Sequence, residues 1–399
     1  MKVRLALLAL ALGGFGIGTT EFAAMGVLPQ FAQDLLPDLW AASQDGAIAK
    51  AGILVSAYAF GVVVGAPLIA ATLARFPRRR LLIGFVVWFA LATVLTSLAP
   101  TFELAVVARF LAALPHGAYF GIAALVAADL MGPGKRGTGV ALVLSGLTIA
   151  NIVGVPLVTW LGQTAGWHVA FRVVAVIFVL AGIAIAVLVP PQPGDPGATV
   201  RRELGALRSG QVWLTLAFGS IGFGGFFAVY SYIAPMVTEL AGMPPGWVPW
   251  ALVIAGVGMT IGNAIGGRLA DRGAIRAVLR TFPVFIVILA LTGVLGGIPV
   301  ALVVLLFAVS FASSALSPAI QTRLMDVAGE SQTLAAAINH SSLNLGNSLG
   351  AALGAGVIAA GYGYRAPALV GVALGIVGFG IAIVAWRLGR RSSRGRRSS

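Results

Sequence analysis

The sequence contains no cysteine and little charge. Of its 399 residues, 12 are acidic, 26 are basic and 3 are histidine. Without thiols the chain cannot form disulfides or thiolate metal sites, and three scattered histidines predict no zinc site. We therefore expect no metal and no cofactor. No motif of the form G-x-x-x-x-G-K-[ST] and no assembled nucleophile and base occur, so the sequence predicts neither direct use of ATP nor an enzyme.

Apolar residues dominate instead. Hydrophobic residues make up 59% of the chain and its mean hydropathy is +0.99. No soluble domain has enough interior for so much apolar surface. The 53 glycines and 20 prolines lie mostly within apolar runs, as membrane helices tolerate. The fold class predicted is an all-α polytopic membrane protein.

Twelve apolar runs are each long enough to cross a bilayer. The first resembles a signal peptide, but it continues well past the usual length, so we expect an uncleaved helix. The predicted spans are at about 4–29, 48–74, 80–99, 101–129, 138–161, 167–189, 211–238, 247–270, 275–296, 298–321, 332–360 and 366–388.

Basic residues support this count. With the N-terminus inside, 22 of the 26 fall in inner segments, as expected for cytoplasmic loops. This predicts twelve spans with both termini cytoplasmic, and we expect the chain in the plasma (cytoplasmic) membrane of a bacterium. The net charge of +14 is then explained by basic residues that set the membrane orientation and contact anionic lipids at the inner face. It does not indicate nucleic-acid binding.

The chain divides into two similar halves. A Pro/Gly-rich stretch at 190–210 predicts a cytoplasmic linker between six-helix bundles at 1–189 and 211–388, and 389–399 is expected to be a disordered basic tail. The segments GAPLIAATLARFPRRR and GNAIGGRLADRGAIR repeat at an offset of 196 residues. Repeated halves are typical of transporters with a substrate site between them.

Those two segments resemble the cytoplasmic signature of the major facilitator superfamily, and the resemblance covers essentially the whole chain. The first copy departs from the pattern, because Arg75 stands in the place of the aspartate. The resemblance implies that the loops latch the inner side closed, and so makes Arg75, Asp271 and Arg272 gating candidates. The second copy keeps Gly266, Gly267, Leu269, Ala270, Asp271, Arg272 and Gly273.

Three further stretches are similar to the twelve-helix drug:proton antiporter branch, above all to its arabinose-efflux-permease-like and chloramphenicol-exporter-like members. They are GTTEFAAMGVLPQFAQDL, ARFLAALPHGAYFGIAALVAADL and SGLTIANIVGVPLVTWLGQTAGWHVAF. The first ends its motif at Asp34, a gating candidate or a solvated helix cap. The second carries Arg109, Gly117 and Gly121. The third carries a modified form of the antiporter motif, with Gly146, Gly154, Pro156 and Gly162. Gly146 and Pro156 are gating candidates, and close packing with a kink is the alternative.

Glu21 is the only acidic residue well inside a predicted span. A charged side chain at the centre of a membrane helix costs about 2.5 to 3.5 kcal/mol even on insertion scales, so its presence indicates a functional role. Glu21 lies eight residues before Pro29 and Arg109 nine after Pro100, which places both about 12–14 Å from the outer ends of their helices. Low dielectric favours a protonated carboxyl and a nearby guanidinium favours the charged form. The pair is a candidate proton-coupling site or, alternatively, a fixed structural ion pair.

Other polar and aromatic residues are candidates for substrate binding or proton relay. His116, seven residues beyond Arg109, could relay protons or simply pack beside the Pro115 kink. The predicted eleventh span is unusually polar, and its polar faces must meet water, another helix or substrate. The substrate-binding candidates, for which helix packing is the alternative in each case, are Tyr119, Asn151, Tyr230, Asn339, His340 and Asn344.

These patterns predict a monomeric transporter that exchanges protons for a small organic solute. A proton-coupled sugar or nucleoside symporter on the same fold is the alternative, and the resemblance favours export only by analogy. A sensor or scaffold would need an extramembrane domain, and no break exceeds about 20 residues.

Overall fold

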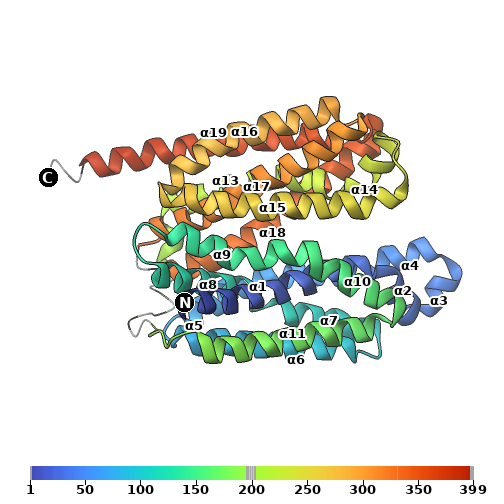
Figure 1. Cartoon of the computed structure of the whole chain (residues 1–399), viewed down its shortest axis with the longest axis horizontal. Coiled ribbons are helices and arrows are strands. Elements are labelled where there is room, and N and C mark those ends of the chain that lie inside the picture. The colour runs from blue at the N-terminus through green and yellow to red at the C-terminus, as the bar shows by residue number, and fades with distance from the viewer. Residues whose placement is uncertain are drawn as a thin grey trace. The chain divides into compact units, whose positions relative to one another are not determined.

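The computed structural model describes residues 2–194, 197, 199, 201, 204–329 and 331–395, and every regular element within these ranges is helical (Figure 1). The elements of the first half are α1 (Lys2–Gly26), α2 (Leu28–Leu35), α3 (Pro37–Ala42), α4 (Gln44–Ala51), α5 (Ile53–Leu73), α6 (Arg78–Ser97), α7 (Phe102–Ala113), α8 (His116–Met131), α9 (Arg136–Ile149), the π-helical turn η1 (Ala150–Gly154), α10 (Val155–Thr164) and α11 (Trp167–Leu188).

The second half follows a short 3-10 turn. Its elements are η2 (Leu204–Arg208), α13 (Gly210–Tyr230), α14 (Ile233–Pro235), the π-helical turn η3 (Met236–Leu240), η4 (Pro245–Trp247), α15 (Val248–Asp271), α16 (Ala274–Leu295), α17 (Pro299–Val327), α18 (Gln332–Val357), the π-helical turn η5 (Ile358–Tyr362) and α19 (Ala366–Gly395).

Eleven stretches of the described residues are long and apolar enough to cross a membrane. They correspond to all the predicted spans except that at 332–360, whose place is taken by α18. This helix has 26 residues, but its asparagines, serines and histidine lower its apolarity. The all-helical membrane fold predicted from the sequence is confirmed, and α18 completes a set of twelve long helical stretches.

Two segments differ from the expectation. The break after the first span is not a loop, because α2, α3 and α4 fill it, and Pro29 and Pro37 lie in the first turns of α2 and α3, where a missing N–H costs nothing. At the other end α19 runs to Gly395, into the stretch 389–399 expected to be disordered. Residues 396–399 lie outside the described residues.

The helices group into two compact units. Unit 1 comprises the described residues of Met1–Leu130, Leu142–Glu203 and Ala336–Ser341, and unit 2 those of Met131–Ala141, Leu204–Ala335 and Ser342–Ser399. In unit 1, α1 packs against α11 and α10, α6 against α11 and α7, and α5 against α7. In unit 2, α15 and α16 pack against α17, and α13 against α19. The start of α9 thus belongs to unit 2, and residues 336–341 of α18 to unit 1.

Many large apolar side chains face outward, as lipid-facing surfaces require. Examples are Trp88, Leu91 and Val176, which are about half exposed or more. Inside unit 1 the helices approach closely through small residues. A Cβ atom at Gly61 of α5 would lie 2.5 Å from the carbonyl oxygen of Phe110 in α7, so the two backbones almost touch there. This crossing positions the site described next.

Candidate functional site

Arg109 lies in the middle of unit 1 with none of its surface exposed. Its helix, α7, begins after Thr101, whose hydroxyl accepts the backbone N–H of Leu104 at 3.4 Å, and carries Glu103 in its first turn. Both features stabilise a helix start. Two turns further on, Arg109 extends from the buried face of the helix. A guanidinium at this depth is costly unless its donors and charge are compensated.

The compensation comes from α1 and from two aromatic rings. Nη1 of Arg109 donates to the carbonyl oxygen of Thr20 at 3.0 Å and approaches the Thr20 hydroxyl at 3.3 Å. The guanidinium carbon lies 4.4 Å from the ring centroid of Tyr58 and 5.7 Å from that of Phe171, in cation–π range. Nε and Nη2 have no hydrogen-bond partner in the described part of the chain. Arg109 therefore faces α1, with spare donors.

Glu21 follows Thr20 directly, so the guanidinium and the carboxylate share one region of unit 1. The carboxylate is half-buried, and the charge of Arg109 acts on it. No ion pair with an N···O distance of 4.0 Å or less joins them among the described residues, where the ion pairs are Arg78–Asp129, Arg136–Asp326 and the weaker His168–Asp34 contact. The two groups are thus close enough to interact and are not locked together.

His116 begins α8, directly after the break in the helix at Pro115. Its Nδ1 lies 3.2 Å from the hydroxyl of Tyr58, and its side chain is buried. On the other side the ring of His340, which belongs to unit 1, lies 5.4 Å from the His116 ring and stacks on Phe120 at 4.4 Å. A continuous buried line therefore runs from Arg109 through Tyr58 and His116 to His340.

Asp271 ends α15 in unit 2 and binds the start of α9. Its Oδ1 accepts the backbone N–H of Thr138 at 3.2 Å, and its Oδ2 accepts the Thr138 hydroxyl proton. Two turns back along α15, Nδ2 of Asn263 donates to the carbonyl oxygen of Ala141 at 2.6 Å. A carboxylate at the first turn of a helix meets free N–H groups and the positive end of the dipole. Asp271 therefore ties the end of α15 to the first turn of α9, and its gating role stays a prediction.

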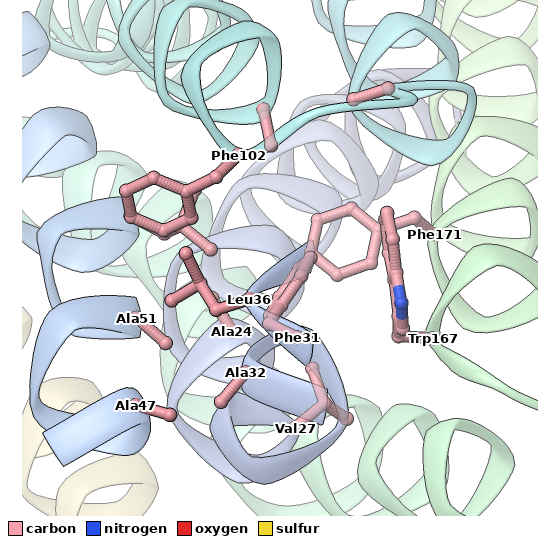
Figure 2. Packing of buried hydrophobic residues seen from close by; sticks show 13 residues of the cluster. Ala24, Val27, Phe31, Ala32, Leu36, Ala47, Ala51, Phe102, Trp167 and Phe171 are labelled. Carbon is pink, nitrogen blue, oxygen red and sulfur yellow. The ribbon is translucent and has the colours of Figure 1, made fainter. Parts of the chain in front are cut away.

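Asp34 of α2 contacts the first residues of α11. Its Oδ2 accepts the indole N–H of Trp167 at 2.8 Å and lies 3.7 Å from Nε2 of His168. Figure 2 shows the neighbouring apolar cluster, in which Phe31 of α2 packs against Trp167 and Phe171, with ring centroids 4.5 and 5.5 Å apart. Asp34 therefore ties α2 to the start of α11, and its gating role stays a prediction.

The predicted interruption of the fifth span is a π-helical turn, η1. Gly146 precedes it on α9, where a Cβ would collide with the carbonyl oxygen of Ala11 and lie 2.7 Å from the backbone nitrogen of Phe15. Asn151 lies within η1 and donates to Leu147 at 3.1 Å, and Pro156 opens α10. π-Turns frequently occur at functional sites. This one lies against α1, the helix of Glu21.

The remaining candidates are dispersed. Tyr119 is buried and donates to the carbonyl oxygen of Leu10 at 2.7 Å, and the Tyr230 ring packs 5.0 Å from that of Phe226 in unit 2. Asn339 belongs to unit 1, like His340, whereas Asn344 belongs to unit 2. Arg75 is exposed and packs on Phe76, and Arg272 is exposed. Substrate-binding and gating roles for these residues stay predictions.

Sequence patterns missed Tyr58, Thr20 and Thr138. Tyr58 sits in an apolar run in which an aromatic residue carries no distinctive signal, and both threonines are common in membrane helices. One signal was available for Thr138: it is the third residue of a helix that begins just after a charged break, where N–H groups are free. The partner of such a helix start cannot be named from spacing alone.

Comparison with known proteins identifies the family. The sequence model of the family described as Major Facilitator Superfamily matches residues 10–296 and 248–399. The inner membrane transport protein YdhP of Escherichia coli (strain K12) is 38% identical over 364 residues, which cover 91% of each chain. The putative transporter AraJ of the same strain is 30% identical over 365 residues, which cover 91% of this chain and 90% of AraJ. A chloramphenicol resistance protein of Streptomyces lividans is 35% identical over 266 residues, 66% of this chain and 65% of that protein.

Solved structures share the fold at lower identity. The human organic anion transporter MFSD10 (TETRAN) matches with a TM-score of 0.78 at 16% identity and covers 95% of this chain and 98% of its own. The Escherichia coli fucose:proton symporter FucP matches with a TM-score of 0.73 at 16% identity, covering 96% and 98%. The resemblance drawn from the sequence motifs is confirmed. The chain is a membrane transporter of the Major Facilitator Superfamily.

Proposed function

We propose that this transporter exports a small organic solute in exchange for protons, by alternating access, with Glu21 as the proton carrier and Arg109 as its electrostatic partner. The observation that carries the proposal is the fully buried Arg109, whose guanidinium contacts the residue next to Glu21 and keeps spare donors. A deprotonated Glu21 could take up those donors, and a protonated one would release them. Such a carboxylate changes its partner as it changes its charge.

Protons provide the energy for this cycle. Each proton that moves inward releases about 2.3 kcal/mol per 100 mV of membrane potential. Since about 1.4 kcal/mol corresponds to a factor of ten in concentration ratio, one proton at 100 mV can sustain a solute gradient of about 50-fold. The site needs only one titrating carboxyl for this purpose, and Glu21 is the only acidic residue well inside a predicted span.

The gate proposed for the inner side is the crossing of α9 and α15. Its support is the pair of hydrogen bonds from Thr138 to Asp271 and the intramembrane bond from Asn263 to Ala141. Arg136 adds an exposed ion pair to Asp326 at 3.4 Å. Breaking these contacts would free the start of α9 from α15 and open a path on that side.

For the substrate we propose a small organic compound, with chloramphenicol-like phenicols tested first. The name of the Streptomyces lividans relative supports this choice. The name of YdhP supports placement in a bacterial inner membrane, and the distribution of basic residues supports cytoplasmic termini. A growth screen of expressing and non-expressing cells against antibiotics, dyes, sugars and nucleosides identifies the solute.

The decisive test is Glu21→Gln in proteoliposomes with an imposed pH gradient and radiolabelled chloramphenicol or the solute found in the screen. We expect wild-type protein to accumulate the solute against its gradient and Glu21→Gln to lose proton-driven accumulation while keeping its level and fold. The matched control is Glu103→Gln, which removes an exposed acid at the start of α7 and leaves accumulation unchanged. Full accumulation by Glu21→Gln would remove it as carrier, and movement of solute in the same direction as protons would identify a symporter.

A further inference from the structure

Tyr58 contacts both ionisable groups that flank it in unit 1. Its ring lies under the guanidinium of Arg109, 4.4 Å from the guanidinium carbon, and its hydroxyl lies 3.2 Å from Nδ1 of His116. The rings of Tyr58 and His116 meet edge to face at 5.9 Å. The side chain is 1% exposed.

The packing of α5 on α7 fixes this placement. Tyr58 lies one turn before Gly61, where the two helices approach closely, and it shares an apolar cluster with Ala112 and Ala113 of α7. Small residues on the α7 side leave room for the phenol ring at the level of Arg109. The ring is buried at this crossing and makes its two contacts at the same time.

We infer that Tyr58 is a positioning residue of the proton-coupling site: its ring holds Arg109 beside α1, and its hydroxyl fixes the orientation and tautomer of His116. The inference rests on the proposed function of Glu21 and Arg109 and adds a link from that pair to His116.

The two contacts have different chemistry. A phenol face attracts a cation whether or not the ring carries a hydroxyl. The hydroxyl has one proton, and it can either donate to an unprotonated Nδ1 or accept from a protonated one. Its loss leaves the imidazole nitrogen without this partner and changes the balance of the two tautomers. Phenylalanine at position 58 therefore keeps the first contact and removes the second, while leucine removes both.

Histidine spectroscopy tests the link without any substrate. The chain has only three histidines, so the imidazole ¹⁵N signals of the full-length protein in nanodiscs can be assigned with His116→Gln and His168→Gln variants. We expect Tyr58→Phe to move the His116 signals and to leave those of His168 in place. The control is Tyr232→Phe, whose hydroxyl donates to the carbonyl oxygen of Ala351 at 2.6 Å, and it should move neither. Unchanged His116 signals in Tyr58→Phe would overturn the inference.

Transport tests the positioning of Arg109. With radiolabelled chloramphenicol and an imposed pH gradient, we expect proton-driven accumulation to fall at least threefold in Tyr58→Phe and at least tenfold in Tyr58→Leu, with Tyr232→Phe within twofold of wild type. A Tyr58→Leu protein as active as wild type would contradict the inference. If wild-type protein does not move chloramphenicol, the phenicol part of the proposed function fails, and the histidine spectra alone then decide for or against Tyr58.

Discussion

Replacing Asp271 by asparagine weakens the contact between α15 and the start of α9 without changing its shape. The carboxylate accepts two hydrogen bonds from Thr138, one at 3.2 Å from the backbone and one from the hydroxyl. An amide offers one acceptor oxygen and no charge. Hydrogen bonds to charged groups contribute about 1.5–3 kcal/mol, and partial exposure of Asp271 reduces this. We expect a loss of about 1–2 kcal/mol, which shifts the population toward the open state about 5- to 30-fold.

The absence of cysteine provides the assay. Ala270 is 4% exposed, and a Cβ at the facing Gly137 would lie 2.6 Å from its side chain, so a cysteine introduced at position 270 is covered while the crossing is closed. The rate at which N-ethylmaleimide labels Ala270→Cys in inside-out membrane vesicles then reports the open fraction. Asp271→Asn should raise this rate about 5- to 30-fold, the same factor as the population shift.

A double-mutant cycle makes the assignment specific. Thr138→Val removes the hydroxyl donor and keeps the backbone N–H, so the effect of Asp271→Asn should shrink in that background. If Asp271→Asn changes the labelling rate by less than twofold, or if the two substitutions act additively, the carboxylate does not hold this crossing and the gate lies elsewhere.

Two further outcomes follow from the same structure. Gly146→Val should lower the stability of the purified protein by about 1–3 kcal/mol, measured as thermal unfolding in detergent, because the new side chain would collide with the backbone of α1. Gly84→Val should not, because Gly84 is exposed and an added Cβ there would meet no atom of another element within 4 Å. Arg136→Gln should raise the N-ethylmaleimide labelling rate of Ala270→Cys less than fivefold, because its ion pair with Asp326 is exposed and such pairs contribute at most about 1 kcal/mol. A larger rise would give the ion pair the main role in the gate.

Sequence predicted the helices well because a bilayer imposes a length. The spans predicted at 80–99 and 167–189 end within two residues of α6 (Arg78–Ser97) and α11 (Trp167–Leu188). The bilayer leaves no such mark on segments outside it, so α2 to α4 were missed although prolines open two of them. The π-turn η1 was anticipated only as an interruption, because glycine, asparagine and proline weaken a helix without specifying its new hydrogen bonds.

The depth of the site residues in the membrane was predictable from the sequence, but the direction in which their side chains point was not. Counting 1.5 Å per residue places Glu21 and Arg109 at one level. Which way a side chain points around its helix is another matter, since lipid-facing and buried faces of a membrane helix are both apolar and the pattern of hydrophobic residues does not separate them. The contact of Arg109 with Thr20, and the insertion of Tyr58 beside it, depend on that angle and required the structure.

A purely structural role accounts poorly for Arg109. Removing a guanidinium from water costs several kcal/mol, and the contacts that offset this cost are two approaches to Thr20 and two ring faces. Nε and Nη2 are left without a partner in the described part of the chain. A methionine would fill the same space with no charge to compensate. The charge is understandable if its partner comes and goes, as we propose for the carboxylate of Glu21.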